Sequence, residues 1–362
     1  MFSHKARADR LRKVLELIKA DACIVKSEEN RRYLTGITTS QGMVVITRAG
    51  NRYFLTDTSY EEMATRSLSP QGFTVRTVGR QAEYAMFINE IIQADKIKVA
   101  LLESNGINHE DYLALENALY AKVMPLKTQL DKLRVVKDLA EVENIKTAQR
   151  INEKSFEDLL GYIKPGMTEK QIQAKLVQLM LENGSDMGRF NICCVSGSNS
   201  SLVHGRATDK IIEKGDNIML EFGAIYNGYH SDMARTISVG QPSDEFRKAY
   251  QIVQNACVIG QRYIRKGVSG RAADTEIRQY IEENGYKNYF RHSLGHGIGI
   301  QLEEGPHLSQ DSTDILTVGN VVTMEPGIYI KGRFGIRIED LLYISPMGTE
   351  NLTRTTRDLI IL

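Results

Sequence analysis

The 362-residue sequence predicts a smaller α/β domain followed by a larger α+β domain, in which helices pack on an antiparallel sheet. Short apolar strands alternate with helical patterns in the first third of the chain. Long amphipathic patterns and acid-bearing strand pairs fill the remainder. The length also exceeds the usual size of one domain. We therefore expect a domain at residues 1–124, a linker at 125–134 and a second domain at 135–362.

The first domain contains short, regular elements. Residues 6–20 have the apolar spacing of an amphipathic helix, and residues 22–26 ("ACIVK") that of a strand. Residues 43–57 predict two strands around the turn Ala49-Gly50-Asn51, and residues 96–103 ("KIKVALLE") predict another. Few acids or histidines cluster here, so we expect this domain to serve packing or oligomerisation.

The second domain begins with longer helices. The spacing predicts a helix over 139–163, and Thr168 is the expected N-cap of a helix that stops at Gly184. Two further helices fit 243–265 and 269–285. The expected strands are 189–195, 217–225, 229–239, 320–330 and 335–345.

Bulk composition excludes several classes of protein. Lysine and arginine total 46 against 45 acidic residues, which gives no reason to expect nucleic acid or an anionic membrane as a partner. The charged N-terminus lacks the apolar stretch of a signal peptide, and no apolar run is long enough to span a bilayer. The four cysteines lack C-x-x-C spacing, so we expect reduced thiols and a cytoplasmic protein.

The stretch "GDNIMLEFGAIYNGYHSDMART", residues 215–236, predicts a hairpin that carries two acids. Asn227-Gly228 favours a two-residue turn, in which Tyr226 faces Tyr229 and Glu221 faces Ala234. Asp232 then lies on the same face as Glu221, one diagonal step away. Two carboxylates held this close repel each other unless a cation lies between them.

A second hairpin repeats the arrangement. A turn near Gly332 sets Glu325 opposite Glu339, and between the hairpins "RHSLGHGIGI" carries His292 and His296. The glycines around His296 leave the backbone bare, so it can approach a crowded centre. Four carboxylates and one imidazole predict a site for two metal ions, and the oxygen-rich set favours manganese, iron or cobalt.

These motifs resemble those of the pita-bread metallopeptidase family, M24. The family includes Xaa-Pro dipeptidase (prolidase), Xaa-Pro aminopeptidase, methionine aminopeptidase and the metal-free creatinase, and the N-terminal part resembles the creatinase-type domain of the prolidase branch. The resemblance covers nearly the whole chain and implies the pita-bread fold. It is carried by "VSGSNSSLVHG", "FGAIYNGYHSDMARTISVG", "HSLGHGIGI", "VVTMEPGIY" and "GIRIEDLLYI".

The resemblance also implies roles for particular residues. The metal ligands would be Glu221, Asp232, His296, Glu325 and Glu339. Glu325 would also handle the proton of the attacking water, while His204 and His292 would line the substrate pocket and steady the reacting carbonyl. Arg337 would brace the ligands and contact substrate.

The chain departs from the family pattern at three positions. Glu221 replaces an aspartate, Ala234 replaces a threonine, and Glu303 replaces a catalytic histidine. The first two could form a volume-conserving swap, because they face each other. Glu303 puts an anion near a developing oxyanion, and the loss of one donor there typically costs about 10²–10³-fold in rate. It could instead grip a cationic substrate.

Three functions follow from the resemblance. The first is a metal-dependent Xaa-Pro peptidase, in which a metal-bound hydroxide attacks the bond before proline in a dipeptide or short peptide. It would hold two divalent ions, manganese before cobalt, iron or zinc, and form a homodimer. The second is a hydrolase of another C–N bond, like the metal-free creatinase. The third is a catalytically impaired peptide-binding protein.

Overall fold

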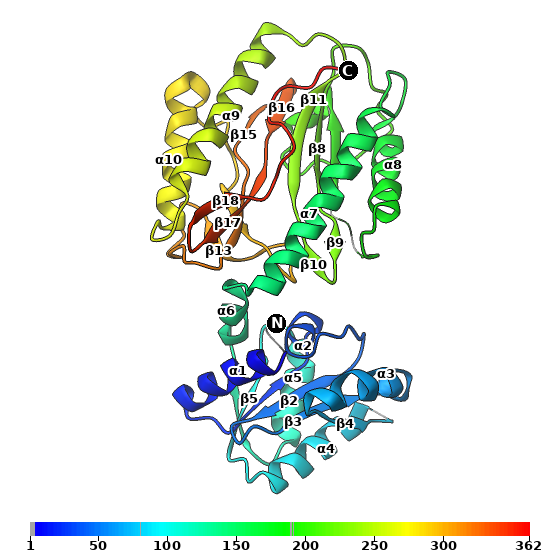
Figure 1. Ribbon diagram of the computed structural model, residues 1–362, viewed down its shortest axis with the longest axis vertical. Helices are drawn as coiled ribbons and strands as arrows, with labels where there is room; N and C mark the ends of the chain where they lie inside the picture. Colours follow the sequence, from blue (N-terminus) through cyan, green and yellow to red (C-terminus); the bar gives the residue numbers. More distant parts are fainter. Residues whose placement is uncertain (1–3, 80, 189, 191) are drawn as a thin grey trace. The chain divides into compact units, whose positions relative to one another are not determined.

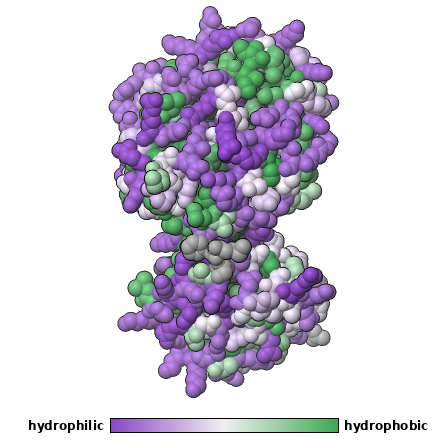
Figure 2. Space-filling view, in the orientation of Figure 1, coloured by the Kyte–Doolittle hydropathy of each residue, from purple (hydrophilic) through white to green (hydrophobic). Residues whose placement is uncertain are grey.

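The computed structural model of the protein describes residues 4–79, 81–188, 190 and 192–362. The chain forms two compact units, Met1–Arg134 and Val135–Leu362, which are called here the N-terminal and C-terminal units. The face shown in Figure 2 is mainly hydrophilic over both units, with scattered apolar patches. None of the described helices has the length and apolar character needed to cross a membrane.

The N-terminal unit is built on one six-stranded sheet with the order β4-β3-β2-β1-β5-β6 (Figure 1). Only β2 runs antiparallel to its neighbours; the other paired strands are parallel. The carboxyl ends of β1, β3, β4, β5 and β6 therefore meet at one edge. The strands are β1 Ala22–Val25, β2 Met43–Thr47, β3 Arg52–Thr56, β4 Thr74–Thr77, β5 Val99–Leu102 and β6 Lys122–Pro125.

Helices cover both faces of this sheet, which confirms the predicted α/β class. Apolar residues of α4 and α5 pack with one face of β1 and β2, whereas α1 and α3 contact β2 and β3 outside that cluster. The residues expected as a linker, 125–134, hold the end of β6 and most of α6. The helices are α1 His4–Ile18, α2 Glu28–Thr35, α3 Thr58–Leu68, α4 Gln81–Ala94, α5 His109–Ala118 and α6 Gln129–Val135.

In its described residues, the C-terminal unit places four α-helices around antiparallel strands, as the sequence predicted (Figure 1). Helix α7 (Leu139–Leu160) begins with a capping box formed by Asp138 and Glu141. Helix α8 (Glu169–Glu182) begins with another, and its N-cap is the predicted Thr168. Helices α9 (Asp244–Tyr263) and α10 (Gly270–Ile281) are capped by serine side chains.

The described strands of this unit form two main sheets and two short ribbons. The orders are β11-β8-β7 and β13-β12-β14-β17-β18, with the ribbons β9-β10 and β15-β16. The strands of the first half are β7 Cys193–Ser196, β8 Asn217–Phe222, β9 Ile225–Tyr226, β10 Tyr229–His230 and β11 Met233–Ser238. Those of the second half are β12 Gly295–Gly297, β13 Glu304–Leu308, β14 Val321–Met324, β15 Gly327–Ile330, β16 Phe334–Arg337, β17 Asp340–Ser345 and β18 Gly348–Asn351. Of the strand expected over 189–195, residues 189 and 191 lie outside the described residues.

Each half of this unit has its own hydrophobic core. Helices α7 and α8 pack on β7, β8 and β11, and helices α9 and α10 pack on β14, β15, β16 and β17. Figure 1 shows the two helix pairs on opposite sides of the strands. The halves join where β11 meets β16, because the Thr236 hydroxyl donates to the Arg337 carbonyl (3.0 Å) and accepts from the Arg337 amide (3.0 Å). Any site built from both hairpins must lie along this seam.

The registers predicted for both acid-bearing hairpins are confirmed. Tyr226 pairs with Tyr229, and Glu221 pairs with Ala234. In the second hairpin the ladders β14–β17 and β15–β16 share one register, so the two glutamates, at 325 and 339, face each other across it.

Three of the expected long strands are interrupted at an acid. Asp232 lies between β10 and β11, Glu325 between β14 and β15, and Glu339 between β16 and β17. The backbone at two of these breaks bonds to other segments. The Glu325 amide donates to the Leu294 carbonyl (2.9 Å), and the Glu339 amide donates to the Ala234 carbonyl (3.0 Å). These two bonds thus fix the backbone of Glu325 and of Glu339.

Candidate metal centre

Three buried carboxylates gather at the seam. Asp232, Glu325 and Glu339 are 6%, 8% and 1% exposed. Burial raises the pKa of Asp232 to about 7. It also raises the pKa of Glu325 and Glu339 well above the ordinary value, and the negative charges of their neighbours add to the effect. The acids are therefore close enough to disfavour each other's charged forms.

Glu339 is the least satisfied of these acids. Among the described residues, neither of its carboxylate oxygens has a hydrogen-bond partner. By contrast, Glu325 accepts a hydrogen bond from the Thr323 hydroxyl (3.3 Å), and Asp232 accepts one from the Met233 amide (3.1 Å). A buried carboxylate without a donor is costly unless a cation compensates it.

His296 lies beside these acids in β12. Its Nδ1 lies 3.0 Å from the Gly297 carbonyl, and its Nε2 lies 3.7 Å from Oε1 of Glu325. Burial lowers the pKa of His296, so the imidazole is neutral. If Nδ1 carries the proton and donates it to the carbonyl, Nε2 keeps its lone pair, which is the form of histidine that binds metals.

The glycines around His296 allow close packing, as the sequence predicted. A Cβ on Gly295 would lie 2.2 Å from the Thr323 carbonyl oxygen, and one on Gly297 would lie 2.1 Å from the Gly305 carbonyl oxygen. Larger residues at these positions would push β12 away from its neighbours. The bare backbone therefore brings His296 to the centre.

Glu221, the fifth predicted ligand, is held differently. Its carboxylate forms an ion pair with the buried guanidinium of Arg337. The same guanidinium donates from Nε to the Tyr329 hydroxyl (2.6 Å) and from Nη2 to the Val203 carbonyl (3.0 Å). It also lies 4.0 Å from Oε2 of Glu325. Arg337 thus contacts two of the acids, and it neutralises Glu221.

His292 and Tyr329 form a linked pair beside Glu325. His292 Nδ1 lies 2.8 Å from the Ser293 carbonyl, and Nε2 lies 2.8 Å from the Tyr329 hydroxyl. Burial lowers the pKa of His292 to about 3, so it is neutral, and the Tyr329 hydroxyl donates to it while accepting from Arg337. Sequence reasoning missed Tyr329. Strand alternation could have found it, because residues 325, 327 and 329 share one face.

His204 and Glu303 lie at the outer edge of the site. His204 is exposed and lines a cavity of about 560 Å³ together with Glu221, Cys193 and Arg206. Partial burial and the charge of Arg337 lower its pKa, while Glu303 acts in the opposite direction. Glu303 is exposed and makes no hydrogen bond or ion pair with another described residue; its neighbour Glu304 pairs with Lys137 (2.8 Å) instead.

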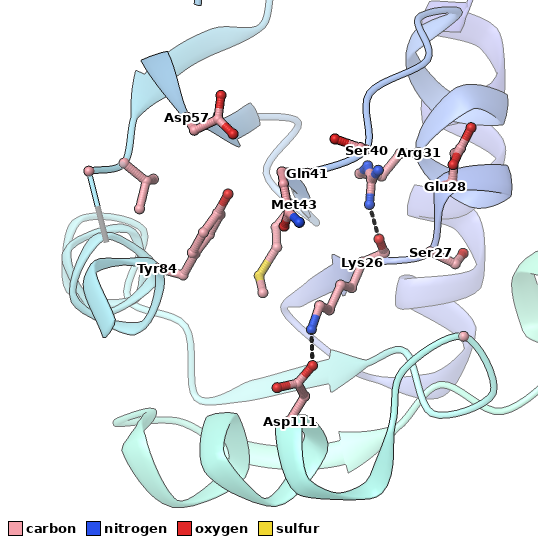
Figure 3. A pocket seen from close by; sticks show the side chains of 14 residues that line it. Lys26, Ser27, Glu28, Arg31, Ser40, Gln41, Met43, Asp57, Tyr84 and Asp111 are labelled. Carbon is pink, nitrogen blue, oxygen red and sulfur yellow. Dashed lines mark hydrogen bonds and ion pairs between the residues drawn. The ribbon is translucent and has the colours of Figure 1, made fainter. Parts of the chain in front are cut away.

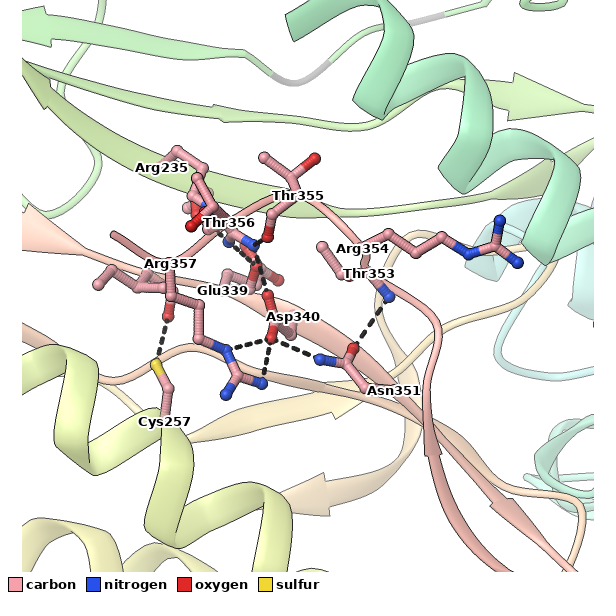
Figure 4. A network of polar contacts seen from close by, with 12 residues as sticks. Arg235, Cys257, Glu339, Asp340, Asn351, Thr353, Arg354, Thr355, Thr356 and Arg357 are labelled. Atoms are coloured by element: carbon pink, nitrogen blue, oxygen red, sulfur yellow. Dashed lines mark hydrogen bonds and ion pairs between the residues drawn. The ribbon is translucent and has the colours of Figure 1, made fainter. Parts of the chain in front are cut away.

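A polar network outside the centre holds the arm that carries Glu339. Arg235 donates to the Glu339 carbonyl (2.6 Å) and pairs with Asp340 (2.7 Å). Asp340 also accepts from Arg357 (2.6 Å) and from Asn351 (2.8 Å). Figure 4 shows these side chains converging on Asp340. The network fixes the backbone of Glu339 without using its carboxylate.

These residues fit a divalent cation only in part. As the side chains lie, no group of three or more His, Cys, Asp or Glu residues in the described part of the chain is arranged to hold a metal ion. One cause is the ion pair with Arg337, which holds the Glu221 carboxylate. The other four donors (Asp232, His296, Glu325 and Glu339) do fit chemically, since they combine three buried acids, a neutral imidazole and two unpartnered oxygens.

Comparison with known proteins identifies related chains. Residues 143–346 match the model of metallopeptidase family M24, and residues 7–136 match the creatinase/prolidase N-terminal domain. An uncharacterized peptidase of Bacillus subtilis is 36% identical over 98% of this chain and 100% of its own length.

Two solved structures also resemble this chain. An Xaa-Pro dipeptidase from Bacillus anthracis matches with a TM-score of 0.94 and 36% identity, over 99% of this chain and 100% of that one. An X-Pro aminopeptidase from Thermotoga maritima matches with a TM-score of 0.90 and 34% identity, over 98% and 100% of the two chains.

Proposed function

We propose that this chain, which belongs to metallopeptidase family M24, hydrolyses the peptide bond before proline in dipeptides or short peptides. The observation that carries the proposal is the unpartnered, buried carboxylate of Glu339 beside Asp232 and Glu325. Related chains named as Xaa-Pro dipeptidase and X-Pro aminopeptidase support the substrate class. The cavity beside Glu221 and His204, about 560 Å³, has the size of a small-ligand site.

Membership of the family implies divalent metal ions. We propose Asp232, His296, Glu325 and Glu339 as the residues that hold them, with Glu221 as a weaker fifth donor. Manganese is the first candidate for the oxygen-rich donor set, before cobalt, iron or zinc. Ions bound there would polarise the scissile carbonyl and make water a better nucleophile at neutral pH.

The protein's own residues would position the substrate and move protons. Glu325 would take and return the proton of the attacking water, because its carboxylate lies beside His296 at the centre. Its Oε2 lies 3.7 Å from Nδ1 of His292, which places the pair at one wall of the centre. His204 and His292, both with lowered pKa, are neutral groups able to steady the reacting carbonyl.

A second candidate is the hydrolysis of another C–N bond in a cationic substrate, such as a guanidino or amidine compound. Glu303 favours it, because this exposed carboxylate has no partner among the described residues and its charge acts on both His204 and His296. An anion at this point would attract a cationic substrate and would oppose a developing oxyanion. A catalytically impaired protein that binds peptides without turnover is the third candidate.

One experiment separates the three candidates. The purified chain is analysed for metal and assayed on Xaa-Pro dipeptides, longer Xaa-Pro peptides and guanidino compounds, with and without a chelator. Cleavage of prolyl bonds that is lost in chelator supports the proposed peptidase. Activity on guanidino compounds alone supports the second candidate. Metal binding without cleavage of either class contradicts both.

Assembly and location are further proposals. The family resemblance supports a homodimer, and light scattering of the purified chain tests it. A cytoplasmic location is supported by the four cysteines, which are buried and unpaired, as thiols are in a reducing compartment. Labelling of free thiols after extraction under non-reducing conditions tests their redox state.

A further inference from the structure

A cavity of about 580 Å³ lies in the N-terminal unit, at the edge where the carboxyl ends of the parallel strands meet. Lys26 follows β1, Asp57 follows β3 and Gly79 follows β4, and all three line it. Figure 3 shows its walls coming from segments far apart in the sequence. Open α/β sheets bind ligands at this edge, and the volume is typical of a small-molecule site.

One wall of this cavity carries a buried cation. Arg31 is 4% exposed, and its guanidinium donates only to the backbone carbonyls of Lys26 and Thr39. Its Nε is buried without a partner. The charges of Glu28, which lines the same wall, and of Glu103 act on Arg31, but neither carboxylate forms an ion pair with it among the described residues. Lys26, the other cation of the cavity, pairs with Asp111. A buried guanidinium that lacks a direct counter-ion favours an anionic group on a ligand.

The opposite wall carries an acid and an unused hydroxyl. Asp57 caps α3 by accepting a hydrogen bond from the Ser59 amide (2.8 Å), and its carboxylate still lines the cavity. The Tyr84 hydroxyl has no hydrogen-bond partner among the described residues. Figure 3 shows Asp57 and Tyr84 across the cavity from Arg31. The two walls therefore offer opposite charges to one occupant.

An apolar cavity of about 340 Å³ adjoins the first. The two share Lys26, Met43, Tyr84 and Asp111. The remaining lining of the second cavity is entirely apolar, namely Ala85, Ala114, Leu115 and Ala118. An apolar substituent on the ligand would be buried there, and removing its apolar surface from water favours binding.

We propose that this pair of cavities binds a small zwitterion with an apolar side chain, which is an α-amino acid or a short peptide. Its carboxylate pairs with Arg31, its ammonium group pairs with Asp57, and its side chain packs between Met43 and Leu115. The acid at Asp57 disfavours a simple fatty anion, and Arg31 disfavours a simple amine. This inference does not rest on the proposed peptidase function.

Calorimetric titration of the full-length protein with L-leucine tests the proposal. Leucinamide lacks the carboxylate and 4-methylpentanoate lacks the ammonium group, so each should bind roughly tenfold more weakly or worse than leucine. Titration of the Glu339→Gln variant with leucyl-leucine distinguishes a peptide from a free amino acid as the preferred ligand. Absence of leucine binding to the wild-type protein overturns the inference.

Three variants assign the two ends of the ligand. Arg31→Gln should weaken the binding of leucine and of 4-methylpentanoate by roughly tenfold or more and leave the binding of leucinamide unchanged. Asp57→Asn should weaken the binding of leucine and leucinamide and leave that of 4-methylpentanoate unchanged. Helix α3 is preserved, because asparagine caps a helix as well as aspartate does. The control is Arg32→Gln, because Arg32 donates to Thr38 and does not line the cavity.

The outcomes also separate this site from the metal centre. Leucine binding that is unchanged in both Arg31→Gln and Asp57→Asn overturns the inference. Binding lost in Glu339→Gln and kept in Arg31→Gln places the amino acid in the metal centre, which overturns this inference and leaves the proposed peptidase untouched. If Arg31→Gln fails to fold, leucine binding to Asp57→Asn is decisive, and unchanged binding overturns the inference.

Discussion

Two regions of the C-terminal unit bury a glutamate almost completely, and they do so in opposite ways. Glu169 is 0% exposed at the start of α8, and Glu339 is 1% exposed between β16 and β17. Glu169 accepts hydrogen bonds from the amides and hydroxyls of Ser196 and Thr208 at 2.6–2.9 Å, and from the Asn199 side chain. Among the described residues, Glu339 accepts none.

The difference separates a structural acid from a binding acid. The protein supplies Glu169 with its own donors, so the charge is satisfied when the chain folds and ties α8 to β7 and the loop at Thr208. The surroundings of Glu339 are equally dry but give its oxygens no donor, and nearby acids raise its pKa further. A carboxylate kept in that condition is suited to a cation from outside the chain.

The largest expected effect comes from Glu339→Gln. It removes a predicted ligand, so peptidase activity should fall by more than the roughly 10–100-fold that outer partners of a metal ligand cost. Metal content per chain should fall with it. The stability of the metal-free protein should not fall, because an unsatisfied buried charge is removed. Metal analysis measures the metal content, a peptidase assay measures the activity, and urea denaturation in chelator measures the stability of the metal-free protein. Lower metal-free stability would mean that Glu339 is a structural acid.

Glu169→Gln is the matched control, with the opposite pattern. It leaves several buried donors short of an acceptor, so the free energy of unfolding should fall by about 2–3 kcal/mol. Metal content per folded chain should stay unchanged. The same denaturation and metal measurements apply. A loss of metal at full stability would contradict the distinction between the two glutamates.

Glu303→His should raise prolyl peptidase activity by roughly 10-fold to 100-fold, because it replaces an anion with a hydrogen-bond donor near the oxyanion. Metal content should stay the same, since Glu303 is an exposed side chain outside the four-donor set. The test is kcat/KM on Xaa-Pro dipeptides beside metal analysis. Activity of the unmodified chain on guanidino compounds that is abolished by this change would favour the second candidate function.

Glu221→Asp should have the smallest effect, a several-fold increase in metal occupancy and activity. The shorter acid reaches Arg337 less well, so its charge becomes available to a cation, and Ala234 opposite leaves room for adjustment. Mass spectrometry under native conditions measures the number of metal ions bound per chain. Unchanged stoichiometry would show that the ion pair with Arg337 does not limit metal binding.

Much of the fold could be predicted because local patterns determine it. The Asn227-Gly228 turn and the period of two in strands predicted that Glu221 faces Ala234, and the capping residue Thr168 predicted the start of α8. The α/β and α+β classes followed from the order of such elements. These features depend on residues close together in sequence.

Other features depend on contacts between distant segments. The strand break at Glu339 arises where the two halves bond across their seam, because its amide donates to the Ala234 carbonyl; no single-strand pattern contains this contact. The link from Tyr329 to Arg337 and the pairing of Arg337 with Glu221 are also long-range. The cavity of the N-terminal unit was missed for the same reason, because six or more separate segments line it. Sequence analysis therefore identified candidate donors but not which of them are free to bind.

The most direct test of the central claim is the hydrolysis of an Xaa-Pro dipeptide by the purified chain, first loaded with Mn²⁺, then treated with chelator and then reloaded. We expect cleavage before proline in the loaded protein, loss of cleavage in chelator and recovery on reloading, with metal content following activity. Cleavage that persists without metal, or metal bound in full with no cleavage of any prolyl peptide, would contradict the claim.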